Sequence, residues 1–155
     1  MTARPIPTTA NDVANAVIAR TRKKGKAISN LELQKLVYYC QAWFLALVGR
    51  PMFDDRIEAG VHGPVVRRLY ARFKRYGWSA ITEPVADPIL PSDVSSMIDE
   101  VLKAYGNFSP WELENLTHNE DPWIIARGGL PPDAECQRAI KHEHMAQYYS
   151  ARARG

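Results

Sequence analysis

The sequence predicts an all-α, single-domain protein with six or seven helices. Three observations support this: apolar residues recur every three or four positions, Gly and Pro separate these stretches, and Ser-x-x-Glu capping boxes precede two of them. The 155 residues, 46% of them hydrophobic, are enough to bury one core. We expect an N-terminal arm over 1–9, a helical domain over 10–149 and a disordered tail over 150–155, which has nothing apolar to bury.

The first helix is expected to run from Asn11 or Asp12 to Lys24. Thr9 or Asn11 can cap its N-terminal end by accepting a hydrogen bond from a backbone N–H of the first turn. Cations gather near its C-terminal end, where they interact favourably with the negative end of the helix dipole.

A longer helix follows and is expected to form the centre of the core. In its capping box the Ser29 hydroxyl accepts from the Glu32 backbone N–H, and the Glu32 carboxylate accepts from the Ser29 N–H. Gly49 and Pro51 provide a stop. Apolar residues at intervals of three or four form one stripe along it: Leu33, Leu36, Val37, Cys40, Phe44 and Leu47.

The segment 52–61 is expected to hold a short extended piece or one arm of a hairpin, because apolar residues alternate with a period of two in its second half. Pro64 suits the first position of a third helix, where its missing N–H would be unpaired anyway. Apolar residues three and four apart continue this helix to Gly77.

Four further helical segments are expected after a proline-rich connection over 84–91. Capping residues, Pro at first helical positions and Gly at helix ends mark them. The expected segments are one capped by Ser92 and ending at Gly106, one from Pro110 to Thr117 and His118, a brief turn opened by Pro122 and Trp123, and a last helix from near Asp133.

Nothing in the sequence indicates export or membrane insertion. The longest purely apolar run, 43–48, is far shorter than the roughly 20 residues that span a bilayer, and the first 25 residues contain no signal h-region. Cys40 and Cys136 are far apart, and Cys40 lies on the apolar stripe, so both are expected to be free thiols in a reducing environment. We therefore expect a cytoplasmic protein.

The residues do not predict an enzyme, a metal site or a bound cofactor. His142 and His144 are two residues apart, which places them on different faces of a helix, and no zinc-type spacing joins them to His118. No Gly-rich nucleotide cradle occurs. Cys136 and His142 are six positions apart on one expected helix, which is too far for a hydrogen bond between their side chains.

Two basic faces support an alternative function in DNA binding or transcriptional regulation. One lies over 20–26 and the other over 67–75. The net charge of +3 is small and no DNA-binding motif is recognisable, so solvated helix faces are the simpler interpretation. The nucleic-acid contacts that this alternative would use are Arg67, Arg68, Arg72 and Arg75.

Large side chains on the central helix favour a protein-binding function. If the apolar stripe faces the core, the remaining aromatic residues lie at its border, where Tyr and Trp are frequent partner anchors. The alternative is that a helix crossing the centre of a small domain is packed nearly all round, so that Tyr39 and Trp43 are core residues. The residues concerned are Gln34, Lys35, Tyr38, Tyr39, Gln41 and Trp43.

Several short motifs occur in an order that resembles one known family. They are L-Q-K-L-V-Y-Y-C-Q over 33–41, I-E-A over 57–59, G-P-V over 63–65, and T-H followed by P-W over 117–123. Each motif is weak alone, but the series resembles the Panacea domain, once a domain of unknown function, which occurs in SocA-like and GepA-like bacterial and prophage proteins. The family usually has an aromatic residue after I-E-A, where this chain has Gly60.

The resemblance implies an antitoxin of a bacterial type II toxin–antitoxin system. Such a domain neutralises a cognate protein toxin, encoded beside it, by direct contact and not by catalysis, and family members pair with toxins of unrelated kinds. A secondary hypothesis is that the antitoxin presents its toxin to an AAA+ protease as an adaptor. Many members carry an added DNA-binding domain, for which this chain has no room, so nucleic-acid binding is not favoured.

The polar and aromatic residues of these motifs are the candidate site residues. Glu58 and His118 are expected to form a structural polar network, with Glu58 accepting from His118 or from a Tyr hydroxyl. Trp123 fits either the core or the rim of a groove. The full set of expected partner-binding residues is Gln34, Lys35, Tyr38, Tyr39, Gln41, Trp43, His62 and Trp123.

Overall fold

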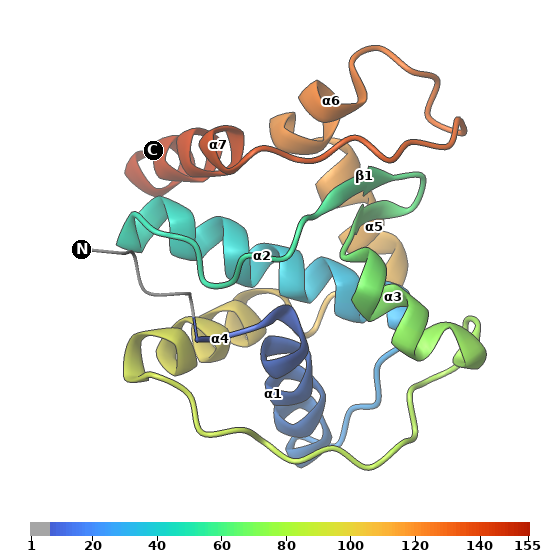
Figure 1. The fold of residues 1–155 in the computed structure, drawn as a ribbon, viewed down its shortest axis with the longest axis vertical. Helices are drawn as coiled ribbons and strands as arrows, with labels where there is room; N and C mark the ends of the chain where they lie inside the picture. Colours follow the sequence, from blue (N-terminus) through green and yellow to red (C-terminus); the bar gives the residue numbers. More distant parts are fainter. Residues whose placement is uncertain (1–6) are drawn as a thin grey trace.

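The computed structural model describes residues 7–155 and confirms a mainly helical fold with one short antiparallel hairpin (Figure 1). Within that range the helices are α1 (Ala10–Lys23), α2 (Asn30–Val48), α3 (Arg67–Phe73), α4 (Ser92–Tyr105), α5 (Pro110–His118), α6 (Asp121–Arg127) and α7 (His142–Arg154). The strands are β1 (Glu58–Gly60) and β2 (Gly63–Val65), and a 3₁₀ helix, η1 (Lys74–Tyr76), follows α3.

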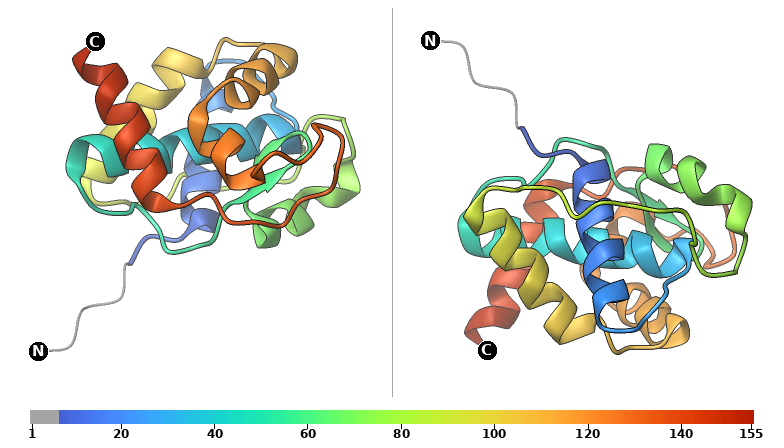
Figure 2. Two further views of the ribbon diagram at one scale, coloured as in Figure 1. Left: turned by 90° about the horizontal axis from the view of Figure 1, so that it is seen from above. Right: turned by 90° about the horizontal axis from the view of Figure 1, so that it is seen from below.

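Helix α2 crosses the middle of the molecule, and the other elements are arranged around it. α7 lies along one side, α1 and α4 lie on the opposite side, and α5 and the hairpin pack near its N-terminal half (Figures 1 and 2). Fourteen of its 19 residues are buried, so the helix is packed nearly all round. Its contact with α7 is the most extensive between any two of the described elements.

Several helix ends agree with their capping signals. The predicted capping boxes that open α2 and α5 are both complete. Thr9 caps α1 in a third box, so α1 begins one residue before the predicted Asn11. Gly49 ends α2 with a φ of 87°, a backbone conformation that glycine adopts without strain.

The extended segment expected near 52–61 is confirmed as strand β1, which pairs with β2. Pro64 lies in β2 opposite Ala59, so the prediction that it opens a third helix is wrong. Pairing with β1 holds the chain extended there, and α3 begins three residues after Pro64 instead. Proline is tolerated at this position because β2 is an edge strand, where a missing N–H leaves no neighbouring strand unpaired.

The boundaries of two C-terminal helices differ from the prediction. Pro91, not Ser92, is the residue that precedes α4. α7 begins at His142, and not near Asp133, because the segment before it lies extended against β1. There the Ala59 N–H donates to Arg138 O over 2.9 Å, and the Ile140 N–H donates to Ile57 O over 2.8 Å.

The sequence predicted an N-terminal arm over 1–9 and a disordered tail over 150–155. Residues 150–154 belong to α7, so this part of the expected disordered tail is helical. The Ser150 hydroxyl donates to Ala46 O over 3.2 Å, which ties the end of α7 to α2. Most of the expected N-terminal arm, residues 1–6, lies outside the described residues.

The structure also shows the state of the two cysteines and the hydropathy of the helices. Cys40 and Cys136 are both buried free thiols, as predicted. Among residues 7–155, no helix combines the length and the apolarity that crossing a bilayer requires.

Candidate partner-binding site

The motif side chains of α2 lie inside the molecule and not on its surface. Five of the expected partner-binding residues are exposed by 2% or less, so they do not form a contact surface in this structure. The alternative interpretation, a helix packed nearly all round, agrees with their burial. These residues are Gln34, Lys35, Tyr38, Tyr39 and Gln41.

The two glutamines of the motif hold backbone segments that follow α2. The Gln34 amide accepts from the Val66 N–H over 2.9 Å, which secures the chain between β2 and α3. The Gln41 amide donates to Phe53 O and accepts from the Met52 N–H, both over 2.7 Å. Each amide therefore satisfies buried backbone groups that would otherwise be unpaired.

The two adjacent tyrosines of the motif enter a buried cluster around Glu120, the residue that precedes α6. The Tyr39 hydroxyl donates to Glu120 Oε1 over 2.7 Å, and the Tyr149 hydroxyl of α7 donates to the same oxygen over 2.8 Å. The Tyr38 hydroxyl lies 3.0 Å from that of Tyr149. Because the Tyr149 proton is directed at Glu120, Tyr38 is the donor in this pair. The cluster joins α2, α6 and α7.

Burial shifts the pKa values of the acidic groups in this cluster. It raises the pKa of Glu120 above the ordinary value, and the two phenol hydrogen bonds oppose that change. It also raises the pKa of Tyr38, Tyr39 and Tyr149, so all three phenols stay protonated and can donate. The arrangement holds helices together, and Glu120 is only 6% exposed.

An aromatic layer covers one side of the cluster. The rings of Tyr39 and Tyr105 stack with centroids 4.0 Å apart and an interplanar angle of 7°. Trp43 is half-buried and donates its indole N–H to the Tyr105 hydroxyl over 2.9 Å. With Met97 and Val101 of α4 and the exposed Leu47, Trp43 and Tyr105 line a shallow groove of about 210 Å³ between α2 and α4.

Glu58 and His118, expected to form one network, do not contact each other. Glu58 forms ion pairs with Arg67 at 2.7 Å and Arg56 at 3.8 Å, on the outer side of the hairpin. The carboxylate that accepts from tyrosines is Glu120, which the sequence reasoning missed. Its only local signal is its place directly before the D-P-W segment, because its tyrosine partners come from distant parts of the chain.

His118 and Trp123 instead form a stacked pair beside the hairpin. Their rings lie 4.1 Å apart at 13°, and burial lowers the pKa of His118. Trp123 is 6% exposed and donates to Gly60 O over 2.8 Å, so it packs in the core and not at the rim of a groove. The buried Arg127 also lies over the Trp123 ring, with its Cζ 4.8 Å from the centroid, and donates to Ala59 O over 2.9 Å.

Lys35 is a buried cation beneath the hairpin turn. Its ammonium donates only to Leu31 O, over 3.3 Å, within the described chain. Burial lowers its pKa to about 8, although the charges of Glu114 and Glu32 oppose this. Gly63 fits closely above it with a φ of 114°: a Cβ there would lie 3.2 Å from Lys35 Cε, so glycine is required for both space and conformation.

His62 is the expected partner-binding residue that is clearly exposed. It lies at the hairpin turn, where Nδ1 is 2.9 Å from Glu114 Oε1 and the ring meets that of Trp78 edge to face at 5.4 Å. Trp78 is 75% exposed, and Trp111, one turn before Glu114 on α5, is also exposed. Exposed aromatic residues of this kind are frequent anchors for protein partners.

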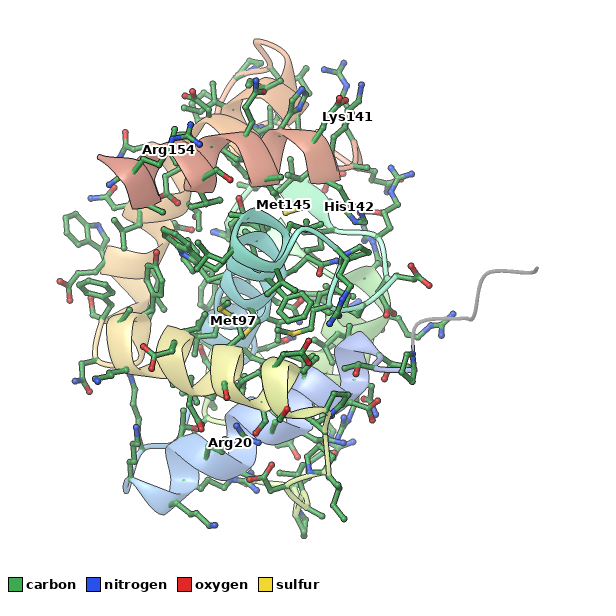
Figure 3. The ribbon with its side chains drawn as sticks, turned by 90° about the vertical axis from the view of Figure 1, so that its left-hand side faces the viewer. Arg20, Met97, Lys141, His142, Met145 and Arg154 are labelled. Carbon is green, nitrogen blue, oxygen red and sulfur yellow. The ribbon has the colours of Figure 1, made fainter. Side chains whose placement is uncertain are left out.

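The basic faces of the DNA-binding alternative are largely engaged within the fold. Arg20 lies between α1 and α4, where it pairs with Asp87 at 3.2 Å and Asp99 at 2.9 Å (Figure 3). Arg72 and Arg75 share Glu83, at 3.1 and 2.8 Å. Of the expected nucleic-acid contacts, Arg67 pairs with Glu58 and Arg68 is exposed. Several of these cations are therefore already paired within the fold, although Arg67 and Arg75 stay 58% and 66% exposed.

The described residues contain no cluster of three or more His, Cys, Asp or Glu side chains that could hold a metal ion. Large apolar side chains are exposed at several points of the domain. Singly scattered ones are ordinary on a protein surface, and adjacent ones such as Ile124 and Ile125 are the candidates for a contact surface. The exposed large apolar residues are Leu47, Val48, Trp78, Ile89, Trp111, Ile124 and Ile125.

Comparison with known proteins identifies the relatives of this chain. Residues 33–124 match the family described as "Antitoxin SocA-like, Panacea domain". Antitoxin SocA of Caulobacter vibrioides (strain NA1000 / CB15N) is 30% identical over 142 residues, covering 83% of this chain and 76% of that relative. No solved structure matches the chain significantly. The family match spans more than half of the chain, and the chain therefore belongs to the SocA-like antitoxin family that carries the Panacea domain.

Proposed function

We propose that this chain is the antitoxin of a toxin–antitoxin pair, and that it neutralises a cognate protein toxin by binding it directly and without catalysis. The observation that carries this proposal is family membership, over 33–124 and with a relative named as an antitoxin. The toxin is expected to be the product of an adjacent reading frame.

The division between buried and exposed residues supports a binding role. The motif residues of α2 hold the core together, and the exposed apolar and aromatic side chains lie at the C-terminal end of α2 or on other elements. A core held by shared motifs leaves the outer surface free to vary from one antitoxin to another. This division is consistent with a family whose members pair with unrelated toxins, because the surface and not the motif would select the partner.

The test is co-expression of this chain with the product of the adjacent reading frame. Induction of the neighbour alone should arrest growth, and simultaneous expression of this chain should restore it. The two purified proteins should co-elute as a stoichiometric complex in size-exclusion chromatography. Growth arrest that this chain does not relieve, with no complex between the purified proteins, would contradict the proposal.

Neutralisation by binding alone and neutralisation by delivery to a protease predict different half-lives for the toxin in the cell. If binding alone blocks the toxin, the purified chain inhibits the toxin's activity and leaves its cellular half-life unchanged. If the chain acts as an adaptor for an AAA+ protease, the toxin's half-life falls when the chain is present and recovers in a host that lacks the protease. We favour direct binding as the primary form, because it needs no further partner.

A further inference from the structure

A cationic pocket lies where α6, the extended segment before α7 and the start of α7 meet. It has a volume of about 400 Å³. In Figure 1, α6 lies above this segment as it leads into α7, and Figure 3 labels Lys141 at the N-terminal end of α7. No carboxylate side chain lines the pocket. The residues around it are Arg56, Ile125, Ala126, Arg138, Lys141 and His144.

Backbone pairing brings two of these cations together. The hydrogen bonds between 57–59 and 138–140 set an antiparallel register in which Glu58 is opposite Ala139. Extended by two residues, the same register places Arg56 opposite Lys141, and both residues line the pocket. Like charges at directly opposed positions repel each other, so an anion between them would be stabilised by both.

Few groups within the described chain neutralise these cations. Arg56 is 60% exposed, lies 3.8 Å from a Glu58 oxygen and donates to Gln137 O. Lys141 has no carboxylate within ion-pair distance among residues 7–155. Asp54 and Glu143 line an adjoining hollow that shares Arg56 and Lys141 with the pocket, but they do not line the pocket itself.

The start of α7 adds polar groups beside the pocket. Among residues 7–155 no side chain caps the N-terminal end of α7, so its first backbone N–H groups have no capping acceptor, while Glu143 in the same turn offsets part of the positive charge there. His144 lines the pocket, and its Nδ1 is buried with no hydrogen-bond partner among the described residues.

The neighbouring surface of α6 is apolar. Ile124 and Ile125 are 44% and 49% exposed, and Ile125 also forms part of the pocket wall. A small anion would leave these two side chains in water. A protein segment that carries an acidic side chain among apolar ones would cover the isoleucines and place its carboxylate beside Lys141 at the same time.

We propose that the cationic pocket and the isoleucines of α6 form the docking site for an acidic, partly apolar segment of the toxin. This inference rests on the proposed function, since it names the surface and the partner chemistry of the same interaction. A toxin Asp or Glu side chain enters the pocket between Arg56 and Lys141, and apolar toxin residues pack on Ile124 and Ile125.

The test measures binding of the adjacent gene's product to variants of the full chain. Lys141→Glu and Ile125→Asn are both at exposed positions and should each raise Kd at least tenfold. The matched controls are Lys103→Glu, an exposed cation on α4, and Ile89→Asn, a fully exposed isoleucine in the connection before α4. Both controls should change Kd by less than twofold. Binding to the wild-type chain should also weaken as salt is increased.

A second measurement identifies the docked segment and does not depend on the variants folding well. A photo-cross-linking residue at position 125 should link to a toxin segment that contains Asp or Glu, and the same residue at position 89 should not link. Changing that toxin acid to Lys should restore binding to the Lys141→Glu variant. Failure of the wild-type chain to bind the neighbour contradicts the proposed function. Normal wild-type binding, with Lys141→Glu equal to its control and no link from position 125, contradicts the docking site alone.

Discussion

Glu120 connects three helices through hydrogen bonds to one of its carboxylate oxygens. A single carboxylate oxygen accepts from two phenols while the side chain is almost entirely withdrawn from water. Two hydrogen bonds to one oxygen satisfy the tyrosines, but they replace only part of the hydration that an ionised carboxylate loses on burial. The cluster therefore favours the protonated acid more than water does.

This preference predicts a pH dependence with a definite sign. Since burial raises the pKa of Glu120 above 4.5, the folded chain holds this proton more tightly than the unfolded chain. Its contribution to stability is greatest below pH 4.5 and is lost as the pH rises through the folded-state pKa. In Glu120→Gln the amide oxygen still accepts from the phenols, so this loss should be absent. Urea unfolding from pH 4.5 to 7.5 measures the difference, with Glu100→Gln, at an exposed site on α4, as control. Identical pH profiles for wild type and Glu120→Gln would contradict it.

The buried Lys35 amine predicts a pH dependence of folding stability in the opposite direction, with the greatest stability at high pH. Its pKa falls from 10.5 to about 8 on folding, so the folded chain releases this proton first and is most stable above pH 10.5. Stability is lost as the pH falls toward 8, and at pH 7 a charged amine is buried. Lys35→Met should therefore raise the free energy of unfolding by about 1–3 kcal/mol at pH 7, and by less at pH 9.5. Denaturant melts at the two pH values test this. A Lys103→Met control should show no such gain, and destabilisation of Lys35→Met at pH 7 would refute the argument.

At the scale of elements, β1 and α7 connect parts of the fold that are far apart in the sequence. β1 pairs with β2 on one side and with the segment around Ala139 on the other, although only three residues long. Trp123 and Arg127 of α6 both donate to β1 backbone oxygens. α7 then packs along α2, with Met145 buried between the two helices (Figure 3).

The docking of α7 should depend on the Tyr149 hydroxyl. Tyr149→Phe removes the donor to Glu120 and the acceptor for Tyr38, so the expected loss is about 1.5–3 kcal/mol, as for other hydrogen bonds to charged groups. Amide hydrogen exchange should show α7 losing protection before α2 does. Tyr148→Phe, next to it and only partly buried, is the matched control and should leave the α7 amides protected. Equal protection in both variants would mean that apolar packing alone holds α7 in place.

At the scale of the whole molecule, the sequence predicted what local signals determine. Capping boxes located the starts of α2 and α5, and the period-two pattern located β1. Pro64 and the start of α7 were misplaced because strand pairing, between residues about 80 positions apart in the case of α7, overrides local helix signals. Likewise, the apolar stripe identifies one buried face of α2, except that its last member, Leu47, is 58% exposed, and only the surrounding helices determine that Tyr38 and Gln41 are buried as well.

Because Tyr38 and Gln41 are buried, a substitution in the core should change stability, whereas a substitution at the proposed docking site should change toxin binding. Tyr38→Phe removes one buried hydrogen bond, so it should lower the free energy of unfolding by about 1 kcal/mol and the melting temperature by about 2–4 °C. Because the side chain does not reach the surface, the Kd for the adjacent gene's product should stay within twofold of wild type. Lys141→Glu should show the reverse: an unchanged melting temperature and a Kd raised at least tenfold. Calorimetric binding and thermal melts on the same samples make the comparison. Lost binding by Tyr38→Phe at an unchanged melting temperature would instead mean that the α2 motif itself reaches the toxin, through an opening of α7 away from the core.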